Sequence, residues 1–383
     1  MDFSYDENQQ MLRDSVSRFV AQEYDFDTRR AIVAGERDDH WQTFAELGWL
    51  MVPFPAELGG LGGSATDLLA IMEELGKGLV VEPFLSAAVL AGGIVAAADS
   101  GPRRAEVIEQ LMSGELELAF AWAEPDSRYH LADVQLRARR DGGDYVLDGR
   151  KAVVLNAPRA GRLVVSARTG GNRYDPDGIS LLYVDPAADG VRMQAYRTVD
   201  GEQAAEIAFD GVRVPAADRL GAEGGALPAI ETVIDRATVA LCAEAVGLMD
   251  TIFRKTLDYT KVRKQFGVPI ASFQALQHRM ADMFIELEQA KSIAIMAAMQ
   301  CDRDGGNAAA AVSAAKSRVG RAARHIGEES VQLHGGIGIT DELDVGHYFK
   351  RLTTVQHLFG STDFHTTRYR QRAGGAESGS QAA

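Results

Sequence analysis

The spacing of hydrophobic residues changes twice along this chain, and this change limits the possible folds more than any other feature. Over residues 6–114 the apolar residues recur at the three- and four-residue spacing of helices. Over residues 116–220 the spacing is that of strands, and beyond Gly225 it is helical again. This order of helices, strands and helices predicts an α+β architecture.

The middle segment predicts a compact β domain. Its apolar runs are short, rich in β-branched residues and separated by turn sequences such as Asp141-Gly142-Gly143-Asp144 and Asp148-Gly149. We expect strands at Leu116 to Trp122, Gln135 to Arg139, Asp144 to Leu147, Leu163 to Arg168, Ile179 to Val184 and Glu206 to Val214.

The flanking segments predict two helical domains. Prolines and two Gly-Gly pairs should interrupt the first at Pro53 to Gly63, before a long helix at Glu73-Glu74-Leu75-Gly76. In the second, one apolar face typical of a bundle helix is formed by Leu276, Met280, Met283, Leu287 and Ala290. The predicted domains are 1–115, 116–225 and 226–372, with a disordered tail at 373–383 that is rich in Gly, Ser, Ala and Gln.

Composition excludes several classes of function. A net charge of −14 over 383 residues would repel a polyanion, so nucleic acid is not an expected partner. No stretch is long and apolar enough to span a bilayer, and the acidic first residues form no secretory signal, so we expect a cytoplasmic protein without a membrane partner. Cys242 and Cys301 lie in apolar helical stretches, as small core residues do, so neither disulfides nor a metal site is expected.

Three segments toward the C-terminal end carry candidate chemistry, whereas Walker loops, dinucleotide-binding glycine motifs, metal-ligand spacings and nucleophile elbows do not occur in the sequence. The three segments are Arg263-Lys264-Gln265-Phe266-Gly267, Ser272-Phe273-Gln274-Ala275 and Val331-Gln332-Leu333-His334-Gly335-Gly336-Ile337-Gly338.

Two interpretations of these segments are open. An arginine at a helix end suits a pyrophosphate, because its planar guanidinium donates parallel hydrogen bonds. Glycines at 335, 336 and 338 also let a backbone approach a flat or phosphorylated ligand closely. Alternatively, Gly335-Gly336 only ends a helix, and Arg263 is a solvated surface charge.

Taken together, the segments resemble the C-terminal bundle of the acyl-CoA dehydrogenase family, where Arg-x-x-Phe-Gly, a Gln-Ala pair and Gln-x-x-Gly-Gly-x-Gly follow in this order. Glu124-Pro125 resembles the start of that family's flavin loop, and the stretch from Leu47-Gly48 to Gly63 resembles its Pro-x-Glu-x-Gly-Gly-x-Gly segment. The likeness covers nearly the whole chain. Within the family, the chain most resembles the small subunit of pimeloyl-CoA dehydrogenase.

The resemblance implies an N-terminal helical domain, a middle β domain and a C-terminal four-helix bundle, assembled as a dimer of dimers. It implies FAD as the cofactor and an acyl-CoA as the substrate. In the family, a carboxylate removes the α-proton of the acyl group while the β-hydrogen leaves as hydride to the flavin. Electron-transfer flavoprotein is the implied electron acceptor.

The resemblance also assigns cofactor contacts. The counterparts of Arg263, Phe266, Gln332 and Gly335-Gly336 reach across the family's dimer interface to the pyrophosphate and adenosine end of the neighbouring subunit's flavin. Further implied cofactor contacts are Gln274 and Ser361.

The chain departs from the family at the catalytic base. The glutamate of the family's Tyr-Glu-Gly-Thr motif falls on Phe359, whose phenyl ring cannot take a proton. The alternative base position of some members, just ahead of an arginine, falls on Ala237 and Thr238. The remaining candidates for a relocated base, each more typical of a cap, a solvated charge or a paired core carboxylate, are Asp235, Glu244 and Asp363.

The flavin-holding segments depart as well. The family's Thr-Glu-Pro-Gly-Ala-Gly-Ser reads Ala123-Glu124-Pro125-Asp126-Ser127-Arg128-Tyr129, and its Trp-Ile-Thr reads Val153-Val154-Leu155. The chain has thus kept the residues that serve a neighbour and lost those that serve its own flavin.

We therefore expect a base-lacking subunit that acts with a homologous catalytic subunit in a heterotetramer. A self-sufficient homo-oligomer with a relocated base is one alternative, and an acyl-CoA-binding or scaffold subunit without a redox role is another. The acyl chain is open among dicarboxylyl, branched and polycyclic groups.

Overall fold

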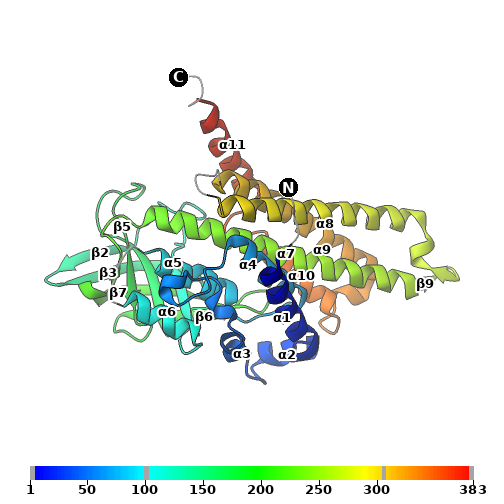
Figure 1. The fold of residues 1–383 in the computed structure, drawn as a ribbon, viewed down its shortest axis with the longest axis horizontal. Helices are drawn as coiled ribbons and strands as arrows, with labels where there is room; N and C mark the ends of the chain where they lie inside the picture. The colour runs from blue at the N-terminus through cyan, green and yellow to red at the C-terminus, as the bar shows by residue number, and fades with distance from the viewer. Residues whose placement is uncertain (1–4, 99–102, 304–307, 379–383) are drawn as a thin grey trace. The chain divides into compact units, whose positions relative to one another are not determined.

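The computed structural model describes residues 5–98, 103–303 and 308–378, which form two compact units (Figure 1). One unit consists of Met1–Arg37, Ser64–Val81 and Thr238–Ala383, and the other of Asp38–Gly63 and Glu82–Ala237. Helix α7 (Leu227–Val262) contributes residues to both units. Among the described helices, none is both long and apolar enough to cross a lipid bilayer.

The first unit, which we call the helical unit, contains most of the helices predicted from the sequence. Besides the C-terminal part of α7, its elements are α1 (Glu7–Glu23), α2 (Phe26–Ala34), α4 (Ala65–Lys77), β9 (Lys264–Gln265), β10 (Val268–Pro269), η5 (Ile270–Ser272), α8 (Gln274–Cys301), α9 (Ala308–His334), η6 (Gly335–Ile339), α10 (Asp344–Val355) and α11 (Thr362–Ser378).

Local sequence explains where these helices begin. Asp6 accepts a hydrogen bond from the backbone N–H of Gln9 at 2.8 Å, and the Gln9 side chain accepts one from the Asp6 N–H at 3.2 Å. Ser64 and Asp67 repeat this reciprocal arrangement at the start of α4. Such capping boxes satisfy N–H groups that have no partner inside the helix.

The predicted apolar face of α8 is confirmed. Met280, Met283, Leu287 and Ala290 are all buried, and Leu276 is half-buried. The neighbouring helix α9 buries many alanines, as expected for closely packed bundle helices.

Two glycines allow α4 and α7 to cross in close contact. A Cβ atom on Gly247 would overlap the backbone carbonyl oxygen of Glu73, and one on Gly76 would overlap that of Glu244. Because only glycine lacks this atom, the crossing requires glycine on both helices. It also fixes the rotation of α7 about its axis, and with it the direction in which Glu244 points.

The end of the helical unit differs from the sequence prediction. Helix α11 continues through Ser378, whereas the sequence predicted a disordered tail from Ala373. Arg370, Gln371 and Arg372, just before the predicted tail, are good helix formers, and each residue added to an existing helix gains a backbone hydrogen bond even where it is a glycine, as at Gly374 and Gly375. Residues 379–383 of the predicted tail lie outside the described residues.

The second unit, which we call the sheet unit, is built on one eight-stranded sheet. The strands are β1 (Leu118–Ala121), β2 (Arg137–Asp141), β3 (Asp144–Leu155), β4 (Arg162–Arg168), β5 (Ile179–Val184), β6 (Val191–Arg197), β7 (Gln203–Pro215) and β8 (Arg219–Leu220). Their order is β6-β7-β3-β2-β4-β5-β8, with β1 paired in parallel to β4. The shorter helical elements of the unit are α3 (Trp41–Glu46), η1 (Trp49–Met51), η2 (Ala56–Leu58), η3 (Phe84–Gly92), α5 (Gly93–Ala97), α6 (Arg104–Met112) and η4 (Ala216–Asp218).

All six predicted strands are present, and the structure adds β6 and β8. Strand β6 reads VRMQAYR and buries none of its residues fully, so it lacks the apolar run that marked the others. Strand β3 extends eight residues past the predicted end at Leu147, because two register shifts against β7 let it continue through Gly149 and Val153. The second shift, between Lys151 and Val154, lies in the part of β3 that belongs to the candidate site described below.

Candidate functional site

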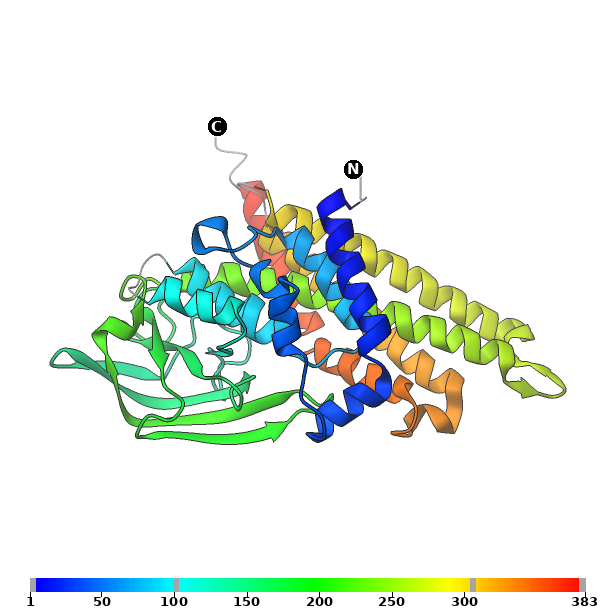
Figure 2. The same ribbon diagram turned by 60° about the horizontal axis from the view of Figure 1, so that its bottom comes forward.

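A hairpin at the end of α7 presents the first predicted cofactor residues. Strands β9 and β10 pair through a turn at Phe266 (φ 53°) and Gly267 (φ 83°), and the Ile270 N–H donates to the Arg263 carbonyl at 2.8 Å. The Phe266 side chain is 93% exposed. The Arg263 guanidinium is exposed and has no hydrogen-bond or ion-pair partner among the described residues. The hairpin projects beyond the ends of α7 and α8 in both views (Figure 1, Figure 2).

The glycine segment lies next to this hairpin. The rings of Tyr259 and His334 stack with centroids 4.4 Å apart, and the Tyr259 hydroxyl donates to the His334 carbonyl at 3.3 Å. This contact joins the end of α7 to the end of α9, so Arg263 and Gly335 belong to one surface.

That surface also contains the other residues predicted near the neighbour's flavin. Gly335 (φ 67°) ends α9 as a left-handed cap, and a Cβ on Gly335 or Gly336 would meet no atom within 4 Å. Gln332 is exposed beside them, and Gln274 is exposed at the start of α8. The cap interpretation of Gly335 is thus confirmed, and the backbone is open to a ligand as well. We call Arg263, Phe266, Gln274, Gln332, Gly335 and Gly336 the hairpin surface.

The structure does not place Ser361 on the hairpin surface. Thr362, the next residue, packs against α9 at Gly320. Fourteen residues separate Gly320 from His334 along α9, which corresponds to roughly 21 Å at the helical rise per residue. The predicted cofactor residues therefore occupy two places on the helical unit.

Ser361 belongs to a turn in which Phe359 and Gly360 are buried. Phe359 (φ 57°) and Gly360 (φ 131°) both have positive φ, which is unusual for a bulky residue such as phenylalanine. Lys316 on α9 donates to the Gly360 carbonyl at 2.7 Å and to the Gln356 carbonyl at 3.3 Å. His365 on α11 lies 3.1 Å from the Phe359 carbonyl through Nε2. We call residues 356–361 the Phe359 turn.

The groups beneath this turn have strongly shifted acid–base properties. Burial lowers the pKa of Lys316 to about 8. Burial, followed by the nearby Lys316 cation, lowers the pKa of His365 to about 3, so its imidazole is neutral near pH 7. Since a carbonyl only accepts hydrogen bonds, Nε2 of this neutral ring carries the proton.

Of the three candidate carboxylates, Glu244 has the clearest structural role. Its two oxygens accept hydrogen bonds from the Arg351 guanidinium at 2.6 and 3.0 Å, and both side chains are at least 90% buried. This two-point pairing is typical of a paired core carboxylate. Asp363 is exposed in the first turn of α11, where the helix dipole favours a negative charge. Asp235 is buried in the part of α7 that belongs to the sheet unit.

In the sheet unit, Glu124 points into the interior rather than toward a ligand. Its carboxylate accepts hydrogen bonds from the N–H groups of Gln135 (2.8 Å) and Leu136 (3.0 Å) and from the Lys151 ammonium (2.9 Å). Burial lowers the pKa of Lys151, and the Glu124 carboxylate opposes that shift. This buried pair anchors the loop that begins at Glu124 to strand β3.

The loop and strand that follow are held in strained conformations. Arg128 (φ 47°) and Val153 (φ 49°) are both left-handed. At the register shift in β3, the Val153 N–H donates to Glu206 Oε1 at 3.1 Å instead of to a strand partner. The Tyr196 hydroxyl donates to the same oxygen at 2.9 Å, and burial together with this carboxylate raises the pKa of Tyr196 to about 12.

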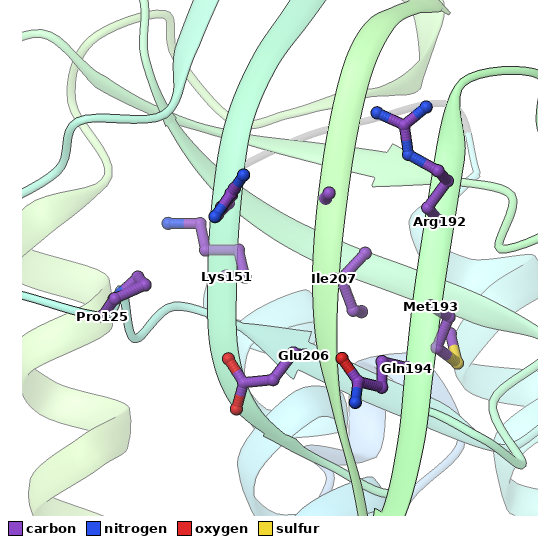
Figure 3. Close-up of a pocket in the computed structure, with 9 residues that line it drawn as sticks. Pro125, Lys151, Arg192, Met193, Gln194, Glu206 and Ile207 are labelled. Atoms are coloured by element: carbon purple, nitrogen blue, oxygen red, sulfur yellow. The ribbon is translucent and has the colours of Figure 1, made fainter.

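A hollow of about 430 Å³ lies on the face of β3, β7 and β6 that carries Glu206 (Figure 3). Arg150 and Arg192 are both aligned with Ala208, one from each neighbouring strand, so two cations flank a small side chain. Glu206 and Gln194 form the next row. The full lining is Pro125, Arg150, Lys151, Arg192, Met193, Gln194, Glu206, Ile207 and Ala208.

Helical segments before and after a β domain are the domain order of one class of dehydrogenases. Sequence profiles of that class match the chain along its length. The acyl-CoA dehydrogenase N-terminal domain matches residues 6–115, the middle domain residues 119–212 and the C-terminal domain residues 224–374. The chain belongs to the acyl-CoA dehydrogenase family, whose members are oxidoreductases and flavoproteins.

Individual relatives agree with this assignment. The probable acyl-CoA dehydrogenase YngJ of Bacillus subtilis is 31% identical over 353 residues, covering 90% of this chain and 92% of the relative. The structure of PigA in complex with FAD superposes with a TM-score of 0.90 at 25% identity, covering 98% of this chain and 99% of PigA. A variant of a steroid ACAD named Tcur3481-Tcur3483 superposes with a TM-score of 0.85 at 25% identity over 97% of this chain and 99% of the other.

Sequence analysis did not identify Lys316, His365 or Glu206. Lys316 had a usable signal, because it is the one lysine in the alanine-rich segment 308–327 and lies at helical spacing from Val312 and Val319. A charged residue on an apolar helix face indicates a buried polar role. His365 and Glu206 had no such signal, since their partners are set by tertiary packing.

We predict that Glu244 and Arg351 act as a structural pair. Arg351→Met should lower the free energy of unfolding by about 3–5 kcal/mol, because it leaves an uncompensated buried carboxylate. The double variant Glu244→Met, Arg351→Met should lower the free energy of unfolding by less than the Arg351→Met variant alone. Urea denaturation followed by circular dichroism measures both. Equal costs for the two proteins would show that the buried charges do not depend on each other.

Proposed function

We propose that this chain is the base-lacking subunit of a heteromeric acyl-CoA dehydrogenase and completes the FAD site of a homologous catalytic subunit. The observation that carries the proposal is the Phe359 turn. Its backbone has two consecutive residues with positive φ, and its side chain at the family's base position is a buried phenyl ring without acid–base chemistry.

The hairpin surface fits the dinucleotide end of FAD. The uncommitted guanidinium of Arg263 can form charge-assisted hydrogen bonds with a pyrophosphate. The exposed backbone at Gly335 and Gly336 has room for a close approach, and the exposed ring of Phe266 offers an apolar surface for an adenosine. When bound, FAD supplies the hydride-accepting chemistry, and in this proposal these residues bind and orient it for the partner.

The half of the site that would serve the chain's own flavin fits less well. At the positions of the family's flavin-loop glycine and its Trp-Ile-Thr, the chain has Arg128 and Val153-Val154-Leu155. Arg128 and Val153 keep left-handed backbones, yet neither offers a hydroxyl or an indole to a flavin ring. The name Tcur3481-Tcur3483 joins two designations in one steroid ACAD, which supports a two-chain arrangement by analogy.

A self-sufficient homo-oligomer with a relocated base is the main alternative, and a non-redox acyl-CoA-binding or scaffold subunit is the second. The pairing of Glu244 with Arg351 disfavours one candidate for the relocated base. Electron-transfer flavoprotein remains the proposed acceptor for the assembled enzyme, as the family resemblance implies.

The visible spectrum of the purified protein separates these functions. We expect the lone chain to carry little flavin and the chain purified with its homologous partner to carry one FAD per pair of chains. The flavin absorbance relative to protein concentration gives the stoichiometry. Stoichiometric flavin and turnover on the lone chain would support the homo-oligomer, and a colourless complex that still binds acyl-CoA would support the scaffold.

Loss of the Arg263 guanidinium should weaken FAD retention. In the complex, Arg263→Ala should raise the dissociation constant of FAD at least about tenfold, since a charge-assisted bond contributes about 1.5–3 kcal/mol. Titration of the apo-complex with FAD, followed by flavin fluorescence, measures this. The matched control is Arg254→Ala, which removes an exposed arginine of α7 that pairs with Asp250. Unchanged FAD affinity in Arg263→Ala would remove Arg263 from the cofactor site.

No carboxylate of this chain should act as the base. Asp235→Asn, Glu244→Gln and Asp363→Asn should each leave turnover of the folded complex within about tenfold of the unmodified complex, whereas loss of a general base costs about 10²- to 10⁴-fold. Removal of the partner's own glutamate is the positive control. Collapse of turnover in one of the three variants, with FAD bound and the oligomer intact, would identify a relocated base here.

A further inference from the structure

Two buried side chains, on two different helices, donate hydrogen bonds to the backbone carbonyls of the Phe359 turn. Lys316 on α9 is fully buried and donates to the carbonyls of Gln356 and Gly360. His365 on α11 is 1% exposed and donates through Nε2 to the carbonyl of Phe359. Three carbonyls within five residues are therefore held by side chains, in a segment that belongs to neither a helix nor a strand at Phe359 and Gly360.

Lys316 is not explained by stability alone. Among the described residues, no carboxylate lies within ion-pair distance of its ammonium, and its neighbours include backbone carbonyls, the thiol of Cys242 and the imidazole of His365. Burial of an ammonium without a counter-ion costs free energy, and an apolar side chain of similar length would avoid that cost. The ammonium instead provides N–H groups that donate hydrogen bonds to the carbonyls of the turn.

We propose that Lys316 and His365 are positioning residues that lock the Phe359 turn in its left-handed conformation and so fix the direction of the Ser361 side chain, a predicted contact of the cofactor. This proposal rests on the proposed function for the identity of that cofactor, whereas the locking of the turn is a property of this chain alone. Neither residue is required to touch FAD or substrate.

The lock should persist when Lys316 loses its proton. A neutral amine still has two N–H groups, which matches its two carbonyl acceptors. The titratable or charged groups that act on Lys316 and His365 include Cys242 on α7 and Arg368 on α11, and the turn itself contains His357. Burial raises the pKa of Cys242 to about 12, so its thiol stays protonated at the pH at which Lys316 loses its proton.

Hydrogen exchange of the purified full-length chain tests the lock without any cofactor or partner. In Lys316→Met, backbone amides in a peptide covering residues 356–361 should exchange at least about tenfold faster than in the unmodified chain, because local opening of the turn becomes easier. His365→Phe should do the same and serves if Lys316→Met does not fold. Lys350→Met is the matched control, since Lys350 is exposed on α10 and pairs with Asp341. Unchanged exchange of the turn in a folded Lys316→Met or His365→Phe chain would overturn the proposal.

A pH series separates positioning from a merely structural role. Because the pKa of Lys316 in the folded chain (about 8) lies below its ordinary 10.5, the folded state releases this proton first. The stability of the unmodified chain should therefore rise relative to Lys316→Met between pH 8 and pH 10.5. Exchange of the turn in the unmodified chain, corrected for intrinsic rates, should stay constant over the same range. Loss of turn protection on deprotonation would contradict a lock made by N–H donors.

A last measurement keeps this proposal distinct from the proposed function. In the complex with the partner subunit, FAD dissociation should be faster for Lys316→Met than for Lys350→Met. If hydrogen exchange of the turn is faster but FAD dissociation is unchanged, Lys316 and His365 lock the turn without affecting the cofactor, and the proposed role toward the cofactor is wrong. If the complex proves to hold no FAD, the proposed function fails, while the exchange data still decide whether Lys316 and His365 lock the turn.

Discussion

The close crossing of α4 and α7 is the constraint on which the helical unit depends. The glycines at 76 and 247 bring the two backbones into direct contact, and this contact sets the rotation of α7. Glu244, whose carbonyl oxygen packs against Gly76, then points its carboxylate at Arg351 on α10. Since α10 runs directly into the Phe359 turn, a displacement at the crossing would reach the turn through one ion pair and one helix.

The order of helices and strands was predictable because burial imposes different periods on the two. Met280, Met283 and Leu287 recur at helical spacing since only one side of α8 faces the core. The same logic failed for β6, whose residues are exposed or half-buried, and for the extension of β3, which depends on left-handed backbone at Val153. A bulge of that kind is stabilised by Glu206, which lies 53 residues away and has no local signature.

The candidate site was predictable as a set of residues and not as an arrangement. Arg263, Phe266 and Gly335 carry recognisable motifs, and the Tyr259–His334 contact brings their segments to one surface. Ser361 was predicted from the same family resemblance, yet its neighbour Thr362 packs against Gly320 near the middle of α9. The role of Glu244 was equally hidden, because its partner Arg351 is 107 residues further along the chain and only packing brings them together.

The backbone of the Phe359 turn is strained for the residue that occupies it. A phenylalanine at a φ of 57° is strained by roughly 1–3 kcal/mol, whereas glycine or asparagine would adopt this backbone at a lower cost. The chain has this strained backbone with a phenyl ring, and no carboxylate, at that position. Under the proposed function, the main-chain shape of this turn would persist in a subunit whose side chain at the family's base position has no acid–base chemistry.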